Sequence, residues 1–192
     1  MKKIFFALIF IVSSLSINAQ DDEIQTLFGS QALHIGGFGG PFMSFTTIDG
    51  QFAHMMGGGG GIIMNNFFIG GYGVGLTNSI PYLGSTDERI NFGHGGFWLG
   101  YNFASRKLVH PAFHLQIGWG SVKPASQQGD PLRDGDNVFV LVPTIEAEMN
   151  ITKYFKLGVG GDYRAVFQAN GDYSSGDLSG PGIFLSFKFG SF

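Results

Sequence analysis

The chain has 192 residues, which suits one domain, and only 13% of them are charged, against roughly 25% in soluble domains. The chain has 11 Lys and Arg and 14 Asp and Glu. Two of the lysines, Lys2 and Lys3, belong to a predicted leader, so the net charge without the leader is 9 − 14 = −5. This negative charge excludes a basic nucleic-acid-binding surface. The chain has 32 Gly and 21 Phe. Because disordered chains are poor in aromatic residues, the glycines are predicted to lie within folded β structure.

The first 19 residues have the parts of a secretory signal peptide. Lys2 and Lys3 form a basic region, Ile4–Val12 is an unbroken apolar run, and we predict cleavage after Ala19. A short membrane anchor is the alternative, but the apolar run is well short of the ~20 residues that a spanning helix needs. The sequence contains no cysteine, which excludes attachment of lipid at a lipobox.

Residues 20–32 are polar with an acidic start, and we predict a short periplasmic arm or a lumen plug there. From residue 33 onward we expect eight strands. The links at 78–88, 123–137 and 168–177 are long and polar, whereas Asp49-Gly50 is a strong hairpin signal. Tight turns on one side and longer loops on the other are typical of a transmembrane β-barrel. The predicted strands cover residues 33–47, 52–64, 67–77, 89–103, 108–122, 138–151, 155–167 and 178–189.

Apolar and polar residues alternate in the last four predicted strands, so each has one apolar face. A soluble sandwich also alternates, with its apolar face inward, so alternation alone does not tell which face meets lipid. Large aromatic residues at the ends of the apolar faces favour lipid outside, since outer-membrane barrels carry aromatic girdles at both interfaces. The predicted girdle consists of Phe103, Phe155 and Phe189 at the end with short turns and Trp119 and Phe167 at the end with long loops.

Glycines are concentrated in two blocks, Gly57–Gly61 and Gly70–Gly75. A nucleotide-binding loop is disfavoured, because that interpretation needs a helix after the glycines and a loop with a proline follows instead. A small barrel needs strong coiling and internal room for side chains from facing strands, and glycine supplies both. The alternative is a pocket for a slender ligand such as an acyl chain. We predict that the glycines of the third strand line the lumen; these are Gly71, Gly73 and Gly75.

Four segments resemble a known family, the small glycine-rich outer-membrane β-barrel proteins of Bacteroidota-type bacteria, which is largely uncharacterised. They are Thr26–Gly29, Gly36–Pro41, Gly57–Gly61 and Gly70–Asn78. The resemblance implies an outer-membrane location and carries no catalytic residues. The final Phe192 also resembles the C-terminal signal of such barrels, although it is out of phase with the apolar row of the last strand.

The charged residues on the polar faces are predicted to form an ion network inside the barrel, because charges in a low-dielectric interior must be paired. The alternatives are a gate, a path for protons or ions, or acid–base catalysis by a carboxylate pair. No catalytic residue, metal site or cofactor is predicted; His110 and His114 are about 13 Å apart along one strand and cannot hold one ion. The predicted network consists of Glu146, Glu148, Lys156, Asp162, Arg164 and Lys188.

Together these patterns predict an all-β fold, an antiparallel up-and-down transmembrane β-barrel of about eight strands over residues 33–192. We expect a monomer in the outer membrane of a Gram-negative bacterium after export, in contact with outer-membrane lipid and with a packed lumen rather than a wide pore. The expected role is non-enzymatic, structural or interactional, through extracellular loops and an extracellular or periplasmic protein partner. The alternatives are a lipid-active barrel enzyme or narrow pore, and an exported soluble β-sandwich or adhesin.

Overall fold

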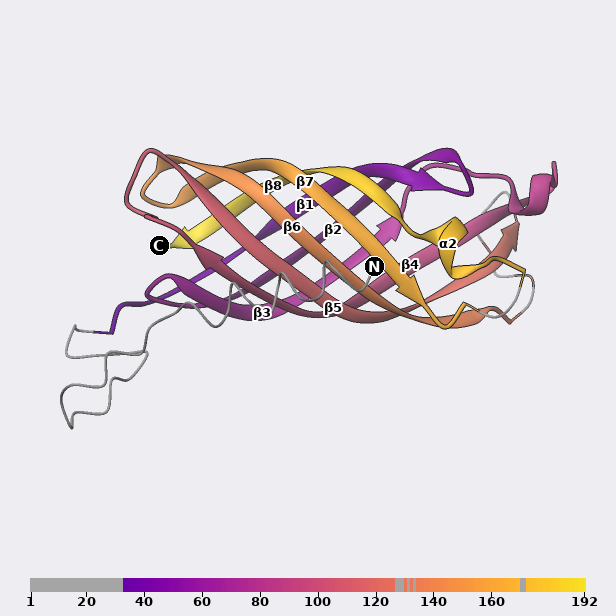
Figure 1. Cartoon of the computed structure of the whole chain (residues 1–192), viewed down its shortest axis with the longest axis horizontal. Coiled ribbons are helices and arrows are strands. Elements are labelled where there is room, and N and C mark those ends of the chain that lie inside the picture. Colours follow the sequence, from indigo (N-terminus) through magenta and orange to yellow (C-terminus); the bar gives the residue numbers. More distant parts are fainter. Residues whose placement is uncertain (1–32, 127–129, 131, 133, 170–171) are drawn as a thin grey trace, which may run out of the picture. The chain divides into compact units, whose positions relative to one another are not determined.

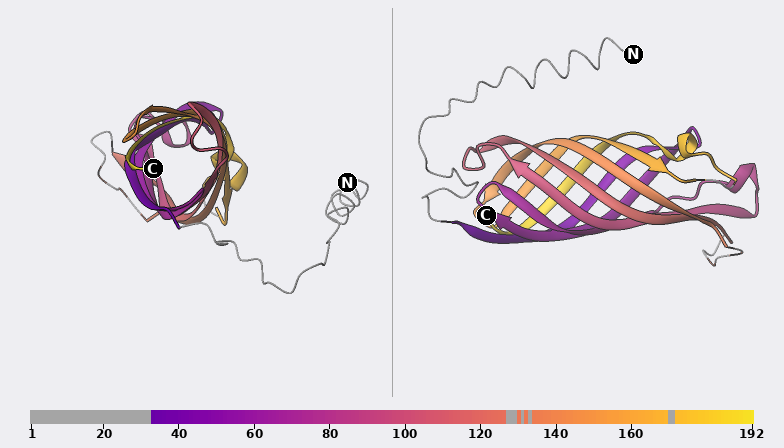
Figure 2. Two further views of the ribbon diagram at one scale, coloured as in Figure 1. Left: turned by 90° about the vertical axis from the view of Figure 1, so that its left-hand side faces the viewer. Right: turned by 60° about the horizontal axis from the view of Figure 1, so that its bottom comes forward.

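The computed structural model describes residues 33–126, 130, 132, 134–169 and 172–192; the predicted signal peptide (1–19) and arm (20–32) lie outside these residues. Eight antiparallel strands pair in chain order, and β8 closes onto β1 (Figures 1 and 2). The predicted eight-stranded up-and-down barrel is therefore confirmed. The strands are β1 (Ile35–Ile48), β2 (Gln51–Met64), β3 (Phe67–Leu76), β4 (Glu88–Asn102), β5 (Val109–Ser126), β6 (Asp136–Thr152), β7 (Phe155–Phe167) and β8 (Gly180–Ser191).

The two ends of the barrel differ in their connections. The turn end carries the links 65–66, 103–108 and 153–154, and the loop end carries the links 49–50, 77–87, 127–135 and 168–179. Asp49 (φ 51°) and Gly50 (φ 69°) are both left-handed, which a two-residue type I′ hairpin requires. The hairpin predicted at these two residues is confirmed.

The structure differs from the predicted boundaries mainly at the loop end. β5 runs to Ser126, because its last residues pair with the start of β4, where Ser126 lies opposite Glu88.

The link predicted as a plain loop contains a short helix, α2 (Ser175–Leu178). Its first turn is closed by a capping box, in which the Asp177 carboxylate accepts from the Ser174 amide (2.9 Å) and the Ser174 hydroxyl accepts from the Asp177 amide (3.3 Å). Hydrogen bonds from the Ser174 hydroxyl and amide hold the pKa of Asp177 below its ordinary value.

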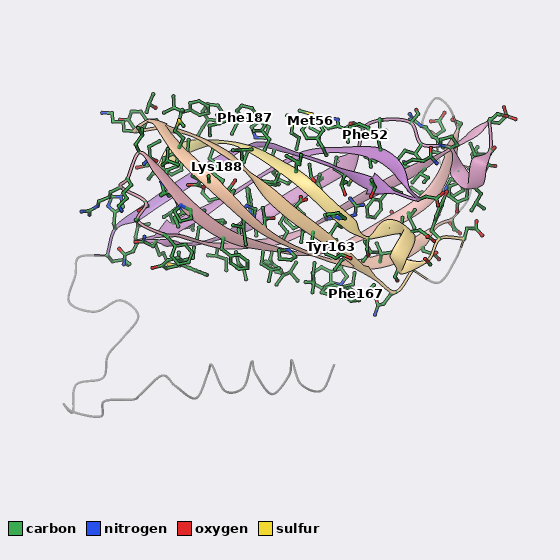
Figure 3. All side chains as sticks on the ribbon, turned by 45° about the horizontal axis from the view of Figure 1, so that its top comes forward. Phe52, Met56, Tyr163, Phe167, Phe187 and Lys188 are labelled. Carbon is green, nitrogen blue, oxygen red and sulfur yellow. The ribbon has the colours of Figure 1, made fainter. Side chains whose placement is uncertain are left out.

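In β5 to β8 the polar rows point into the barrel and the apolar rows point outward. Figure 3 shows the outward side chains of Phe167 and Phe187 and the inward position of Lys188. Ile145 and Ile183 have 67% and 61% of their surface exposed. The alternative of a soluble sandwich is wrong, because the sheet is closed and its apolar rows do not pack against a second sheet.

β3 has the opposite orientation to the one predicted. Gly71 and Gly73 are exposed on the outer surface with Gly75 on the same face, whereas Phe68 and Tyr72 are buried inside. A glycine carries no polarity, so the large side chains of β3 decide its orientation, and they fill the interior.

Glycines of neighbouring strands make the internal room that β3 was expected to provide. A Cβ atom added at Gly59 of β2 would lie 2.8 Å from Cε3 of Trp98, and one added at Gly100 of β4 would overlap the ring of Phe68. The interior therefore accommodates large aromatic side chains only because these inward positions have no side chain of their own.

Candidate functional site

A cluster of buried charges lies inside the barrel, built by β6, β7 and β8. Glu146 and Glu148 are two residues apart on β6 and so point inward together. The ammonium group of Lys188 donates to both carboxylates. Lys156 Nζ lies 3.5 Å from Glu148 Oε2. All four residues are at most 3% exposed, so each charge is shielded from water and balanced by its neighbours.

Glycine and serine of the adjacent strands make this cluster possible. Glu148 lies opposite Gly158 on β7, which in turn lies opposite Ser186 on β8. A Cβ at position 158 would overlap the carboxylate of Glu146. The Ser186 hydroxyl donates to Glu146 Oε2 at 2.9 Å. The carboxylate of Glu146 therefore extends over Gly158 and reaches β8.

Two histidines of β5 extend the cluster, and sequence reasoning did not connect them to it. His110 Nε2 lies 3.1 Å from Glu148 Oε2, and His114 Nε2 lies 3.4 Å from Glu146 Oε1. The Trp98 indole donates to His114 Nδ1 at 3.0 Å, so the proton of a neutral His114 is on Nε2, which faces the carboxylate. Register could have identified His110, because it pairs directly with Glu148 across β5 and β6.

Asp162 and Arg164 were predicted to join this network, and that part of the prediction is wrong. Among the described residues, no ion pair connects either of them to the cluster. Arg164 instead donates to the backbone carbonyls of Leu178 (2.7 Å) and Thr47 (2.8 Å) at the loop end. Asp162 is six residues from Lys156 along β7, which corresponds to about 20 Å of strand.

The middle of the barrel is filled rather than open. Trp98 packs edge-on against Phe38 and Phe68, and Phe42 lies 5.4 Å from Phe184 between ring centroids. A cavity of about 20 Å³ borders Gln116, Asp162 and Arg164 among others. This volume holds about one or two water molecules. This cavity is too small for an acyl chain.

The loop end is closed by apolar side chains from two long links. Ile80 and Tyr82 of one link and Tyr173 and Leu178 of the other are buried against the interior valines of β6 and β7. The Tyr82 hydroxyl donates to Asp172 Oδ2 at 2.9 Å, and the Leu83 amide donates to the Tyr173 hydroxyl at 2.8 Å. We call the contact between these two links the loop clasp.

Replacing Tyr173 by alanine is expected to open the loop clasp, because both its ring contact with Tyr82 (5.2 Å) and the acceptor for the Leu83 amide disappear. Hydrogen exchange followed by mass spectrometry checks this, with faster exchange expected across 80–84. The matched variant Tyr173→Phe keeps the ring and should speed exchange at Leu83 alone. Unchanged protection in the alanine variant would contradict the clasp.

The predicted aromatic girdle residues lie on the outer face. Phe103, Trp119, Phe167 and Phe189 are exposed, and Phe155 is half-buried. Phe155 stacks on Phe189 with 4.8 Å between centroids at the turn end. Near the loop end, Phe139 bridges Trp119 and Phe167 at 5.6 and 6.1 Å. The aromatics thus form two groups at opposite ends of the outer surface.

Within the described ranges, no group of three or more His, Cys, Asp or Glu side chains is placed to hold a metal ion. In the same part of the chain, no helix is both long enough and apolar enough to span a membrane.

Neither family models nor curated proteins match the chain. Solved structures do. Neisserial surface protein A (NspA) is similar over 84% of this chain and 99% of its own, with a TM-score of 0.61 and 10% identity. Ail, the attachment invasion locus protein of Yersinia pestis, in complex with the heparin analogue sucrose octasulfate, is similar over 83% and 99%, with a TM-score of 0.52 and 14% identity. At these identities the likeness shows the fold, a closed eight-stranded antiparallel β-barrel.

Proposed function

We propose that the chain is a non-enzymatic outer-membrane β-barrel whose outer face contacts lipid and whose loop end presents an interaction surface. The observation that carries this proposal is the reversed distribution of polarity. Large apolar residues such as Ile145, Ile183 and Trp119 are exposed, whereas four charged residues inside the barrel, Glu146, Glu148, Lys156 and Lys188, are buried. Soluble monomers rarely expose contiguous apolar surface on this scale, and a membrane tolerates strands only as a closed barrel.

Location in the outer membrane of a Gram-negative bacterium is part of the same proposal. It is supported by the closed barrel, by the two aromatic groups at its ends and by the leader-like sequence of residues 1–19. The likeness to a neisserial surface protein and to an attachment invasion locus protein is compatible with a role at the cell surface.

The interior supports a packed lumen that does not conduct. Aromatic rings fill its middle, the buried charges are paired, and the loop clasp with its apolar neighbours closes the loop end. Planar-bilayer recordings of the purified protein should show no steady conductance; regular single-channel steps would contradict a packed lumen.

The loop end supports an interactional rather than a catalytic role. The loop clasp holds two long links in one arrangement, so that they offer a preformed surface to an extracellular protein. A lipid-active enzyme would need an activated nucleophile, and the serine best placed beside a buried acid, Ser186, donates to Glu146 instead of to a histidine. No observation favours the enzyme over the interaction role.

Replacing Ile145 by arginine tests the membrane itself. Ile145 lies midway along β6 on the outer face. If that face meets lipid, arginine near the middle of the bilayer should lower the free energy of unfolding by about 2–4 kcal/mol. Urea unfolding in phosphatidylcholine vesicles measures this change, and heat-modifiable mobility on gels reports the folded fraction.

The matched control is Leu83→Arg, in the link 77–87, where the side chain is 57% exposed at the loop end. This control should unfold like the parent protein. If Ile145→Arg were also neutral, or stabilising, the outer face would be facing water and the proposal would fail.

A further inference from the structure

The charged side chains of the barrel are sorted by position. The interior holds three carboxylates, on Glu146, Glu148 and Asp162, and three cations, on Lys156, Arg164 and Lys188, and so is neutral overall. Acidic side chains are numerous in and beside the links of the loop end, from Asp49 to Asp177. The turn end has the opposite character: among its described residues it carries no Asp or Glu side chain. Its exposed cations are Arg106, Lys107 and Lys153, which we call the basic collar.

The three cations of the basic collar lie on neighbouring turns. The side-chain amide of Asn150, near the end of β6, donates to the carbonyls of Ser105 (2.9 Å) and Lys107 (2.7 Å). These bonds fix the link 103–108 against β6, and Lys153 follows Asn150 by three residues. No ion pair joins the collar to a carboxylate of the described residues. The collar is therefore a positive patch that the described part of the barrel does not neutralise.

Apolar and aromatic side chains surround the collar. Leu108 is 68% exposed beside Lys107, and Tyr154 is 58% exposed beside Lys153, whose ammonium lies 4.9 Å from the tyrosine ring centroid. The stacked pair of Phe155 and Phe189 follows immediately on the outer face. Aromatic rings at headgroup level with cations just beyond them are placed to meet lipid phosphates while the rings enter the boundary of the acyl chains.

We propose that the basic collar binds the phosphate groups of anionic lipid headgroups in the leaflet at the turn end. The inference rests on the proposed function, because it requires the barrel to lie in a bilayer. A lipid fits better than an acidic peptide, since exposed Leu108 and Tyr154 beside the cations are suited to a membrane boundary. Each cation near such a surface adds attraction that falls off within a Debye length, so binding weakens with salt.

The test compares the parent protein with the triple variant Arg106→Gln, Lys107→Gln, Lys153→Gln. Both are folded into vesicles of phosphatidylcholine alone and into vesicles of equimolar phosphatidylcholine and phosphatidylglycerol. Tryptophan fluorescence gives the urea midpoint of each. The triple variant should unfold at a lower urea concentration than the parent protein in the phosphatidylglycerol vesicles and at the same concentration in phosphatidylcholine alone. Added NaCl should reduce the difference.

Lys123→Gln is the control, because it removes a cation near the end of β5 at the loop end. It should not lower the midpoint in the phosphatidylglycerol vesicles. Two results would overturn the inference. One is that parent and triple variant have equal urea midpoints in both lipids. The other is that the midpoint of the triple variant falls by the same amount in both lipids, which would assign the collar a role within the protein. Heat-modifiable mobility in phosphatidylcholine keeps the two proposals apart. If the barrel inserts into phosphatidylcholine but shows no lipid preference, only this inference is wrong. If the chain never inserts, the proposed function is wrong.

Discussion

Replacing Lys188 by methionine is expected to lower the free energy of unfolding by about 3–5 kcal/mol, because it leaves buried carboxylates without their shared cation. Lys188 is 3% exposed and donates to both Glu146 and Glu148. Among the described carboxylates, Lys156 forms an ion pair with Glu148 only, at 3.5 Å, so it cannot replace Lys188 at Glu146. Urea unfolding in vesicles, followed by tryptophan fluorescence, measures the change.

The control for this variant is Lys153→Met, which removes an exposed cation at the turn end and should change stability in phosphatidylcholine vesicles by less than about 0.5 kcal/mol. A second variant separates the charge from the packing. Adding Glu146→Gln to Lys188→Met removes one of the stranded charges and should restore part of the lost stability. If Lys188→Met were no worse than Lys153→Met, the buried cluster would contribute nothing to stability.

Alanine at Gly59 is expected to lower the free energy of unfolding by about 1–3 kcal/mol through overpacking of the barrel interior. The added Cβ would lie 2.6 Å from the Gly71 carbonyl oxygen and 2.8 Å from Cε3 of Trp98. The Trp98 ring is enclosed by Phe38, Phe42 and Phe68, so it has little freedom to move away. The same urea experiment measures the loss, and a change in the fluorescence of the folded protein should accompany it.

Alanine at Gly73 is the matched control, because Gly73 lies on the outer face of β3 with nothing within 4 Å of an added Cβ. Glycine weakens a strand relative to alanine by roughly 0.5–1 kcal/mol, so Gly73→Ala should be neutral or slightly stabilising. The opposite result, with Gly73→Ala destabilising and Gly59→Ala tolerated, would show that β3 has the orientation that the sequence pattern predicted and not that of the structure.

The last four strands were predictable because polar side chains mark one face of each: charged residues in β6, β7 and β8, and His110, His114 and Gln116 in β5. Once the fold is taken to be a barrel, the inward row of a strand is the one that carries its charged residues. Examples are Lys156 and Arg164 on β7 and Lys188 on β8. β3 offers no such marker, since its two faces are glycine and aromatic, and either composition is compatible with lipid or with a crowded lumen.

The limits of the predicted ion network have a similar origin. Alternation shows that Glu146, Lys156 and Asp162 share the interior, but it does not give their height along the barrel axis. Their height follows from the register between strands, which aligns Glu148 with His110 and sets Asp162 opposite Thr144. Because alternation alone does not give the register, the sequence pattern did not assign the histidines to the network and did assign Asp162 and Arg164 to it.

Local pattern was therefore sufficient for the number of strands, their order, the Asp49-Gly50 hairpin and the outward apolar rows, because all of these depend on neighbours in the chain. The charge cluster around Lys188, the loop clasp and the aromatic filling over Gly59 and Gly100 could be found only in the folded barrel. Their partners come from strands and links far apart in the sequence, and closure of the sheet, with its particular stagger, is what brings them into contact.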